Sequence, residues 1–162
     1  MKILFVCMGN ICRSPLAAVA AGQAFQEAGL VPRIAIDSAG TLDDHAGRPA
    51  DARSIALAAE FGLDLGGHRA RPVRADDFHE AEIIVAMDRR NIADLRRVAP
   101  APAWGRIRLL MSFAGQTQGE VPDPYYGGRA EFEHSFALIR EGVAGLTKHL
   151  VHLHNPGSKS PE

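Results

Sequence analysis

Short apolar runs alternate with helix-like stripes along this chain, and this alternation limits the possible folds more than any other feature. The runs typical of buried strands are residues 2–7, 34–36, 83–87 and 107–110, and we expect a turn at residues 38–40 after the second run. Apolar residues recur at helical spacing in residues 16–24, 50–60, 92–98 and 132–150. Alternating strands and helices predict a parallel sheet. We therefore expect a doubly wound α/β fold, with a four-stranded parallel sheet and helices on both faces.

The length of 162 residues fits one domain with a core of its own. No repeat or linker divides the chain, so we expect a single domain over residues 1–154 and a polar C-terminal tail over residues 155–162. The formal net charge of −1 gives no electrostatic reason to expect binding to nucleic acid or to an anionic membrane. No stretch has the length of a membrane span or a signal peptide.

The turn that leaves the first apolar run carries the clearest chemistry. Residues 7–14 read Cys-Met-Gly-Asn-Ile-Cys-Arg-Ser, and a helix follows for which Ser14 is the expected N-cap. In parallel sheets, ligands bind beyond the carboxyl ends of the strands, where this turn lies. Five residues separate Cys7 from Arg13, so one loop can wrap around a tetrahedral anion. We predict a phosphate-binding loop between the first strand and the first helix. Besides Cys7 and Arg13, this loop contains Met8, Gly9, Asn10, Ile11, Cys12 and Ser14.

Each residue type in this loop suits anion chemistry. Gly9 and Asn10 tolerate the left-handed backbone that a ring of inward N–H groups requires. The guanidinium of Arg13 can grip two oxygens of a phosphate, and the same positive field favours the thiolate of Cys7. A hydroxyl at Ser14 can donate to that sulfur. A Cys and an Arg at this spacing are a weak signal alone, and their position between a strand and a helix favours a functional interpretation.

The two cysteines, Cys7 and Cys12, also carry a redox prediction. They lie five positions apart and cannot cross-link distant parts of a fold, which favours a reducing, cytoplasmic setting. A loop that encircles one anion brings its ends close together. We therefore expect the two thiols to lie within range of a reversible disulfide after oxidation.

The motifs together resemble the low-molecular-weight protein tyrosine phosphatase family. Relatives share the Cys-x-Gly-Asn-x-Cys-Arg-Ser loop, and further blocks match at residues 38–41, 67–70, 86–89 and 123–127. The blocks occur in the family's order, from residue 2 to about residue 150. The resemblance implies a cysteine-dependent phosphatase that hydrolyses phosphotyrosine and other aryl phosphate esters, without metal or cofactor.

The family's catalytic roles can be carried over to three residues. Cys7 would be the nucleophile that forms a phosphocysteine intermediate, and Arg13 would bind the charged oxygens. Asp123 would be the general acid for the leaving phenolate, and then the general base for the attacking water. The implied partner is a phosphotyrosine-containing protein, with a tyrosine kinase as a further candidate.

Other matching residues imply a supporting network and a substrate cleft. Ser38 and His68 would support the unusual backbone of Asn10, whereas Tyr125 and Tyr126 would line the cleft. Many relatives carry an aromatic residue at the cleft, shortly after the block at residues 38–41. This chain has Asp44 in that region, so we expect one wall of the cleft to be polar or acidic.

Three alternative functions compete with this interpretation. An arsenate reductase of the same fold needs further cysteines downstream, and this chain has none after Cys12. A phosphoarginine phosphatase of the same family carries threonine where this chain has Ile11, and an apolar side chain fits an aryl phosphate better. A silent phosphotyrosine-binding module needs neither a nucleophile nor an acid, yet Cys7 and Asp123 are both present.

Two other features have structural interpretations. Asp88 opens the expected helix after the third strand, where an aspartate serves as an N-cap. Three histidines, His149, His152 and His154, end the last expected helix, where partly cationic side chains suit the helix dipole. No carboxylate or cysteine completes a ligand set with them, so we expect no metal there.

Overall fold

Four parallel strands form the centre of the fold in the computed structural model, which describes residues 1–157. Their spatial order is β2-β1-β3-β4. The strands are β1 (Lys2–Cys7), β2 (Ala35–Gly40), β3 (Ile83–Ala86) and β4 (Ile107–Leu109). β1 therefore lies between two neighbours, and it ends at Cys7, beside Gly40 of β2. This arrangement places Cys7 at the carboxyl edge of the sheet, as expected.

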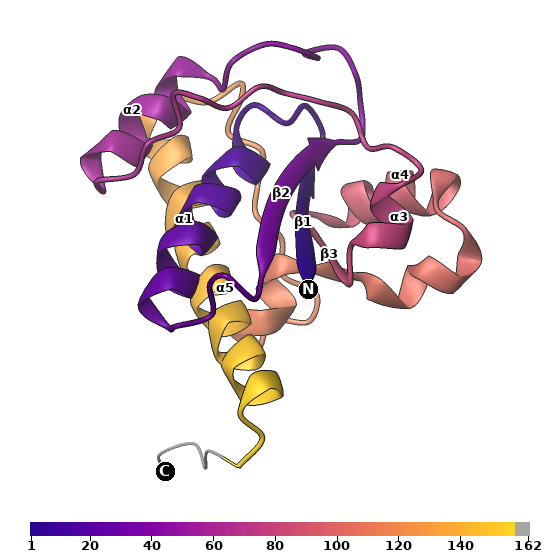
Figure 1. The fold of residues 1–162 in the computed structure, drawn as a ribbon. Coiled ribbons are helices and arrows are strands. Elements are labelled where there is room, and N and C mark those ends of the chain that lie inside the picture. The colour runs from indigo at the N-terminus through magenta and orange to yellow at the C-terminus, as the bar shows by residue number, and fades with distance from the viewer. Residues whose placement is uncertain (158–162) are drawn as a thin grey trace.

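Helices cover both faces of this sheet (Figure 1). One face carries α1 (Arg13–Glu27), α2 (Ala52–Glu60) and α5 (Arg129–His154), and the other carries α3 (Asp77–Glu80), α4 (Arg89–Val98) and the 3-10 helix η1 (Ala101–Arg106). Side chains of β1 alternate between two apolar clusters: Ile3 and Phe5 pack under α1 and α5, whereas Leu4 and Val6 pack under α3 and α4. The predicted doubly wound α/β architecture is confirmed.

The long closing helix α5 buries the apolar stripe that its sequence predicts, namely Phe132, Phe136, Ile139, Val143, Leu146 and Leu150. Each such side chain contributes about 1.5–3 kcal/mol to stability when it is buried. The helix also approaches the 3-10 helix η2 (Leu110–Ala114) very closely, since a Cβ atom at Gly145 would lie 2.0 Å from the carbonyl oxygen of Phe113. Glycine at this position therefore lets α5 seat against η2.

Two local predictions were wrong. A turn was expected at residues 38–40, but these residues complete β2, because Ser38, Ala39 and Gly40 pair with the last residues of β1. Ser14 was expected to cap the first helix, but α1 starts at Arg13, and its N-cap Cys12 makes no side-chain capping bond. The hydroxyl of Ser14 instead hydrogen-bonds inside the loop.

Two further predictions concern the surface and the tail. Among residues 1–157, no helix is both long enough and apolar enough to span a membrane. α5 ends at His154, and most of the polar tail predicted for residues 155–162 lies outside the described residues.

Candidate active site

The loop between β1 and α1 is held from outside through its carbonyl groups. The amide of Thr41 donates to the Cys7 carbonyl (2.9 Å), that of Leu42 to Met8 (3.0 Å) and that of Asp51 to Ile11 (2.8 Å). In the part of the chain that the structure describes, no amide of residues 8–12 donates to a protein acceptor. These five N–H groups stay available, and such successive amides form an anion-binding nest.

Asn10 carries the strained point of the loop and the bonds that hold it. Its φ of 56° lies in the left-handed region, which asparagine tolerates better than most residues. Its side-chain amide donates to the hydroxyls of Ser14 (2.8 Å) and Ser38 (3.0 Å), and its side-chain oxygen accepts from the backbone of Arg71 (3.0 Å). Because Asn10 is fully buried, these bonds determine the loop conformation.

His68 holds the same residue from the other side. Its Nε2 lies 2.7 Å from the carbonyl oxygen of Asn10, so this nitrogen must carry the donated proton. Burial lowers the pKa of His68, although the bond to Asn10 acts in the opposite direction. The structure thus brings Asn10, Ser38 and His68 together.

The thiol of Cys7 lies beneath this network. Its sulfur is 3.0 Å from the hydroxyl oxygen of Ser14, and Cys7 is 2% exposed. The hydroxyl in turn accepts a hydrogen bond from the side-chain amide of Asn10, so its own proton can point at the sulfur or, over a longer 3.5 Å, at the carbonyl oxygen of Ala39. Ser14 can therefore stabilise negative charge on Cys7.

The guanidinium of Arg13 is buried and held from two directions. Its Nη1 donates to the carboxylate of Asp88 (2.6 Å) and to the carbonyl of Val121 (2.9 Å). Burial opposes the charge of Arg13, but Cys7 and Asp88 outweigh it and hold the pKa of Arg13 above its ordinary value. The group remains a cation, and its orientation beside the loop is already set before a substrate arrives.

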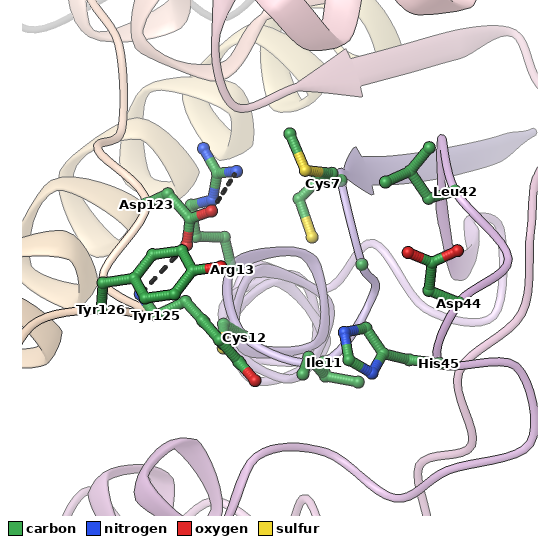
Figure 2. A pocket seen from close by; sticks show the side chains of 12 residues that line it. Cys7, Ile11, Cys12, Arg13, Leu42, Asp44, His45, Asp123, Tyr125 and Tyr126 are labelled. Carbon is green, nitrogen blue, oxygen red and sulfur yellow. Dashed lines mark hydrogen bonds and ion pairs between the residues drawn. The ribbon is translucent and has the colours of Figure 1, made fainter.

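The loop after η2 brings Asp123 to the opposite side of the same cleft. A carboxylate oxygen of Asp123 lies 3.7 Å from Nη2 of Arg13, and the other accepts a hydrogen bond from the Tyr125 amide at 3.1 Å. The Asp123 side chain is 42% exposed, so solvent can reach it. Cys7, Arg13 and Asp123, which lie far apart in sequence, therefore meet at one cleft (Figure 2).

This cleft has a volume of about 310 Å³ and two unlike walls. Figure 2 shows Tyr125, Tyr126 and Asp123 on one side of Cys7, and Leu42, Asp44 and His45 on the other. Tyr125 is partly exposed, and Tyr126 is almost completely exposed. The structure thus places Asp44 and both tyrosines among the lining residues.

The second cysteine, Cys12, is a buried thiol at the base of the cleft. Burial, reinforced by the negative charge of Asp51, raises the pKa of Cys12 to about 12. Cys12 is therefore a neutral thiol at physiological pH. Both cysteines are reduced in this structure.

Comparison with known proteins places this geometry in a family. The family model described as low molecular weight phosphotyrosine protein phosphatase matches residues 2–154. The chain belongs to this family. It is therefore classed as a protein-tyrosine phosphatase, a hydrolase of phosphoric monoesters.

Individual relatives resemble this phosphatase along nearly their whole length. The low molecular weight protein-tyrosine-phosphatase of Streptomyces coelicolor is 39% identical over 149 residues, with 90% of each chain covered. The crystal structure of a protein tyrosine phosphatase from Entamoeba histolytica has a TM-score of 0.88 at 33% identity, and covers 98% of this chain and 99% of its own. Wzb of Vibrio vulnificus in complex with benzylphosphonate has a TM-score of 0.82 at 30% identity, and covers 91% of this chain and 97% of its own.

Three residues of the phosphatase site escaped the sequence analysis. Asp88 was expected only as a helix cap, and it does cap α4, but its second oxygen also holds Arg13. His45 packs over the loop, since a Cβ atom at Gly9 would lie 2.9 Å from its ring. Its ring centroid lies 6.3 Å from that of Tyr125 across the cleft, so the wall opposite Tyr125 is an imidazole beside the acidic Asp44.

Arg53 is the third residue, and no sequence signal marked it. Its guanidinium donates to the carbonyls of Tyr125 and Gly127, both at 3.0 Å, and lies 4.3 Å from the ring centroid of Phe132. The same side chain pairs with Asp51, whose amide donates to the carbonyl of Ile11 in the loop. Arg53 thereby connects the segment after Asp123 to the phosphate-binding loop.

The histidines near the end of α5, His149, His152 and His154, do not line the catalytic cleft. Within residues 1–157, no group of three or more His, Cys, Asp or Glu side chains could hold a metal ion. The ring of His149 instead packs against Phe113, with centroids 5.4 Å apart.

Proposed function

We propose that this phosphatase hydrolyses phosphotyrosine and other aryl phosphates through a phosphocysteine intermediate on Cys7. The observation that supports it most is the convergence of a buried thiol, a buried guanidinium and a solvent-reachable carboxylate on one cleft. A nucleophile, a charge-stabilising group and a proton carrier are what this two-step reaction requires.

In the first step, the thiolate of Cys7 attacks phosphorus. The S–P bond forms as the P–O bond to the phenol breaks, and Asp123 gives its proton to the departing oxygen. Arg13 and the free amides of residues 8–12 stabilise the charge on the transferred group.

In the second step, a water molecule attacks the phosphocysteine, and Asp123 removes its proton. The S–P bond breaks, and the sulfur leaves as a thiolate that the Ser14 hydroxyl stabilises from 3.0 Å. Inorganic phosphate is the product. The positive charge comes from Arg13 and backbone dipoles, so neither step requires a metal ion.

The apolar parts of the cleft support an aryl substrate. Ile11 and Leu42 line it together with Tyr125, whose ring can stack on a phenyl group. Wzb, a structural relative, binds benzylphosphonate, a phosphonate with an aryl group, which agrees with this assignment. Phosphoarginine stays the second candidate, and Ile11 makes it less favourable. An arsenate reductase relay is disfavoured by the absence of any cysteine beyond Cys7 and Cys12.

The substrate we propose is a phosphotyrosine-containing protein, with a tyrosine kinase as a further partner. We place the reaction in the cytoplasm, because a catalytic thiol needs reducing surroundings. The phosphatase domain is proposed to end near residue 154. Asp44 in the cleft should disfavour acidic residues directly beside the phosphotyrosine, an effect that salt screens.

A substrate panel with a chelator present tests the proposal. Phosphotyrosine, phosphoserine, phosphoarginine and arsenate are compared for turnover, and we expect phosphotyrosine to be preferred. Cys7→Ser should abolish turnover while phosphate still binds, and the matched variant Cys12→Ser should keep most activity. Activity that disappears in chelator and returns with zinc or magnesium would contradict the mechanism.

A further inference from the structure

An ion cluster of three residues connects β2 to α3, outside the lining of the catalytic cleft. At its centre, the guanidinium of Arg71 donates to both carboxylate oxygens of Asp77, each at 2.9 Å. A further bond, at 2.8 Å, reaches the carboxylate of Asp37 in β2. The side chains of Arg71 and Asp77 are only 19% and 4% exposed, so water screens this pair little.

Both members of the buried pair remain charged. Burial alone would raise the pKa of Asp77, but bonds from Arg71 and from the amide of Arg74 outweigh burial and hold this pKa below its ordinary value. The bond to Asp77 in turn holds the pKa of Arg71 above its ordinary value. Asp37 is shared, since Nζ of Lys2 lies 4.0 Å from the carboxylate oxygen that binds Arg71. Removal of one partner from a buried pair leaves the other charge uncompensated, so the three residues hold one another in place.

The backbone of Arg71 connects this cluster to the phosphate-binding loop. Its carbonyl accepts from the amide of Gly40 at 2.9 Å, and the amide of Val73 donates to the carbonyl of Gly40 at 2.8 Å. Residues 71–73 therefore run along the outer edge of β2. From this place, the amide of Arg71 donates at 3.0 Å to the side-chain oxygen of Asn10, the residue of the loop with a left-handed backbone.

Asp37 reaches the same asparagine by a second route. One of its carboxylate oxygens binds Arg71, and the other accepts from the amide of Ser38 at 2.8 Å. The hydroxyl of Ser38 accepts from the side-chain nitrogen of Asn10 at 3.0 Å. The cluster therefore fixes two groups outside the loop, one of which binds the oxygen of the Asn10 side chain and the other its nitrogen.

We propose that Arg71, held by Asp77 and Asp37, is a positioning residue for the phosphate-binding loop, an inference that rests on the proposed function. The ion cluster sets the place of the Arg71 amide, and this amide helps to fix the side chain of Asn10. Asn10 in turn keeps the backbone conformation that leaves the amides of residues 8–12 available to one phosphate. A small displacement of Asn10 would spread these donors apart, so phosphate binding and turnover should weaken together.

A purely structural role is the competing explanation, in which the cluster only attaches α3 to the sheet. Arg106 supplies a matched control for that role, because it is also a partly buried arginine that holds α3. Its guanidinium donates to the carbonyls of Phe78 and Ala81, at the end of this helix. Arg106→Lys should therefore lower the melting temperature without changing the loop, whereas Arg71→Lys should change both.

Binding of inorganic phosphate, measured by isothermal titration calorimetry well below each melting temperature, separates the two explanations. Arg71→Lys keeps the charge but loses the planar fork that binds both carboxylates, and we expect its Kd for phosphate to rise about tenfold. The kcat/KM on p-nitrophenyl phosphate should fall by a similar factor. Asp77→Asn should behave in the same way, and Arg106→Lys should keep the parental Kd. A parental Kd in Arg71→Lys, or an equal rise in Arg106→Lys, would overturn the proposal.

Nuclear magnetic resonance on isotope-labelled protein observes Asn10 directly. The signals of its side-chain amide should shift in Arg71→Lys and in Asp77→Asn, because the bonds at both ends of this group change. These signals should stay in place in Arg106→Lys. Unchanged Asn10 signals in all three variants would mean that the cluster acts on the fold alone.

A double-variant cycle tests whether Arg71 acts through Asn10. Asn10→Ala already removes the side chain that Arg71 holds, so Arg71→Lys should weaken phosphate binding little further in that background. Ser38→Ala, which removes one bond of Asn10, serves in the same cycle if Asn10→Ala does not fold. Fully additive losses in the cycle would overturn the proposal. Phosphate binding that depends on Arg71, in a protein that hydrolyses no phosphotyrosine substrate, would support the positioning role and overturn the proposed function instead.

Discussion

The carboxylate of Asp88 accepts a hydrogen bond from Nη1 of Arg13 at 2.6 Å while its other oxygen caps α4 through the amide of Asn91 at 2.8 Å. One side chain therefore starts a helix and orients the guanidinium of Arg13. The two tasks need different chemistry, because a cap requires an acceptor, whereas the bond to Arg13 gains its strength from negative charge.

Replacement of Asp88 by Asn should separate these tasks. Asparagine can still cap α4, so the melting temperature should change little, but kcat/KM should fall by roughly ten- to a hundredfold, since a hydrogen bond to a charged group is lost. Asp88→Ala should lower both quantities. Melting curves and steady-state kinetics on p-nitrophenyl phosphate decide the matter, and an Asn variant with parental kinetics would exclude the positioning role.

Asp123→Asn should reveal the general acid through the leaving group. Esters of weakly acidic phenols should lose about 10²–10⁴-fold in rate, because their oxygen needs a proton as it departs. Esters of strongly acidic phenols should lose far less. Asparagine can still accept the bond from the Tyr125 amide, so the loop should keep its shape. The same loss on both kinds of ester would refute the assignment.

His68 predicts a pH dependence of stability. Burial lowers its pKa below the ordinary value of 6.5, so the unfolded chain binds the proton more readily than the folded one. Neutral His68 makes its full contribution to the free energy of unfolding above pH 6.5. This contribution is lost as the pH falls through the lower pKa that His68 has in the folded protein. Urea unfolding midpoints between neutral pH and about pH 5 should fall less in His68→Gln than in the parent. An identical decline in both proteins would contradict this prediction.

Arg53→Lys should affect catalysis without removing a charge. Lysine cannot reach both carbonyls that Arg53 holds, at Tyr125 and Gly127, so the segment that carries Asp123 should loosen. We expect kcat on esters with poor leaving groups to fall by about tenfold, with a smaller change on good ones. Arg129→Lys is the matched control, since within residues 1–157 the ion pairs of Arg129 are those with Glu60 and Glu133 on the surface. If the two variants behaved alike, Arg53 would have no positioning role.

Peroxide should inactivate the enzyme reversibly through both cysteines. The Cys7 thiolate reduces peroxide and becomes a sulfenic acid, and the Cys12 thiol then displaces water to form a disulfide. With a pKa of about 12, Cys12 is itself a poor first target. Cys12→Ser should keep most activity but recover poorly with added thiol. Mass spectrometry should find a loss of two hydrogens that links the two positions, and an oxidised Cys7 beside a free Cys12 would disprove the bridge.

The parts of the site that the sequence predicts well are those that local patterns encode. The loop from Cys7 to Ser14 follows an apolar strand and opens a helix, so its place at the sheet edge follows from the order of elements. The positions of strands and helices could be predicted because the spacing of apolar residues along the chain reflects which side chains are buried. The family resemblance added Asp123 and His68, which no local pattern would select.

Long-range contacts account for what the sequence did not reveal. Asp88 has the same local signature whether or not Arg13, 75 residues away, reaches its second oxygen. Gly40 read as a turn residue, yet it ends a strand, where a Cβ atom would lie 2.6 Å from the Met8 carbonyl oxygen. In the sequence, nothing distinguishes Arg53 from other surface arginines. Its contact with Tyr125 arises only when the chain folds. Such relationships depend on tertiary packing, which spacing along the chain does not encode.

The packing of α5 against η2 also affects how the protein folds during its synthesis. Cys7 precedes α5 in the chain, and α5 completes the core under α1, so Cys7 leaves the ribosome before this helix does. The nascent chain therefore presents the proposed nucleophile before the apolar cluster that supports the loop can close. Gly145 permits this closure, because a larger side chain would meet the backbone of Phe113. During synthesis this domain cannot close before α5 has emerged, although the loop that starts at residue 7 emerges much earlier.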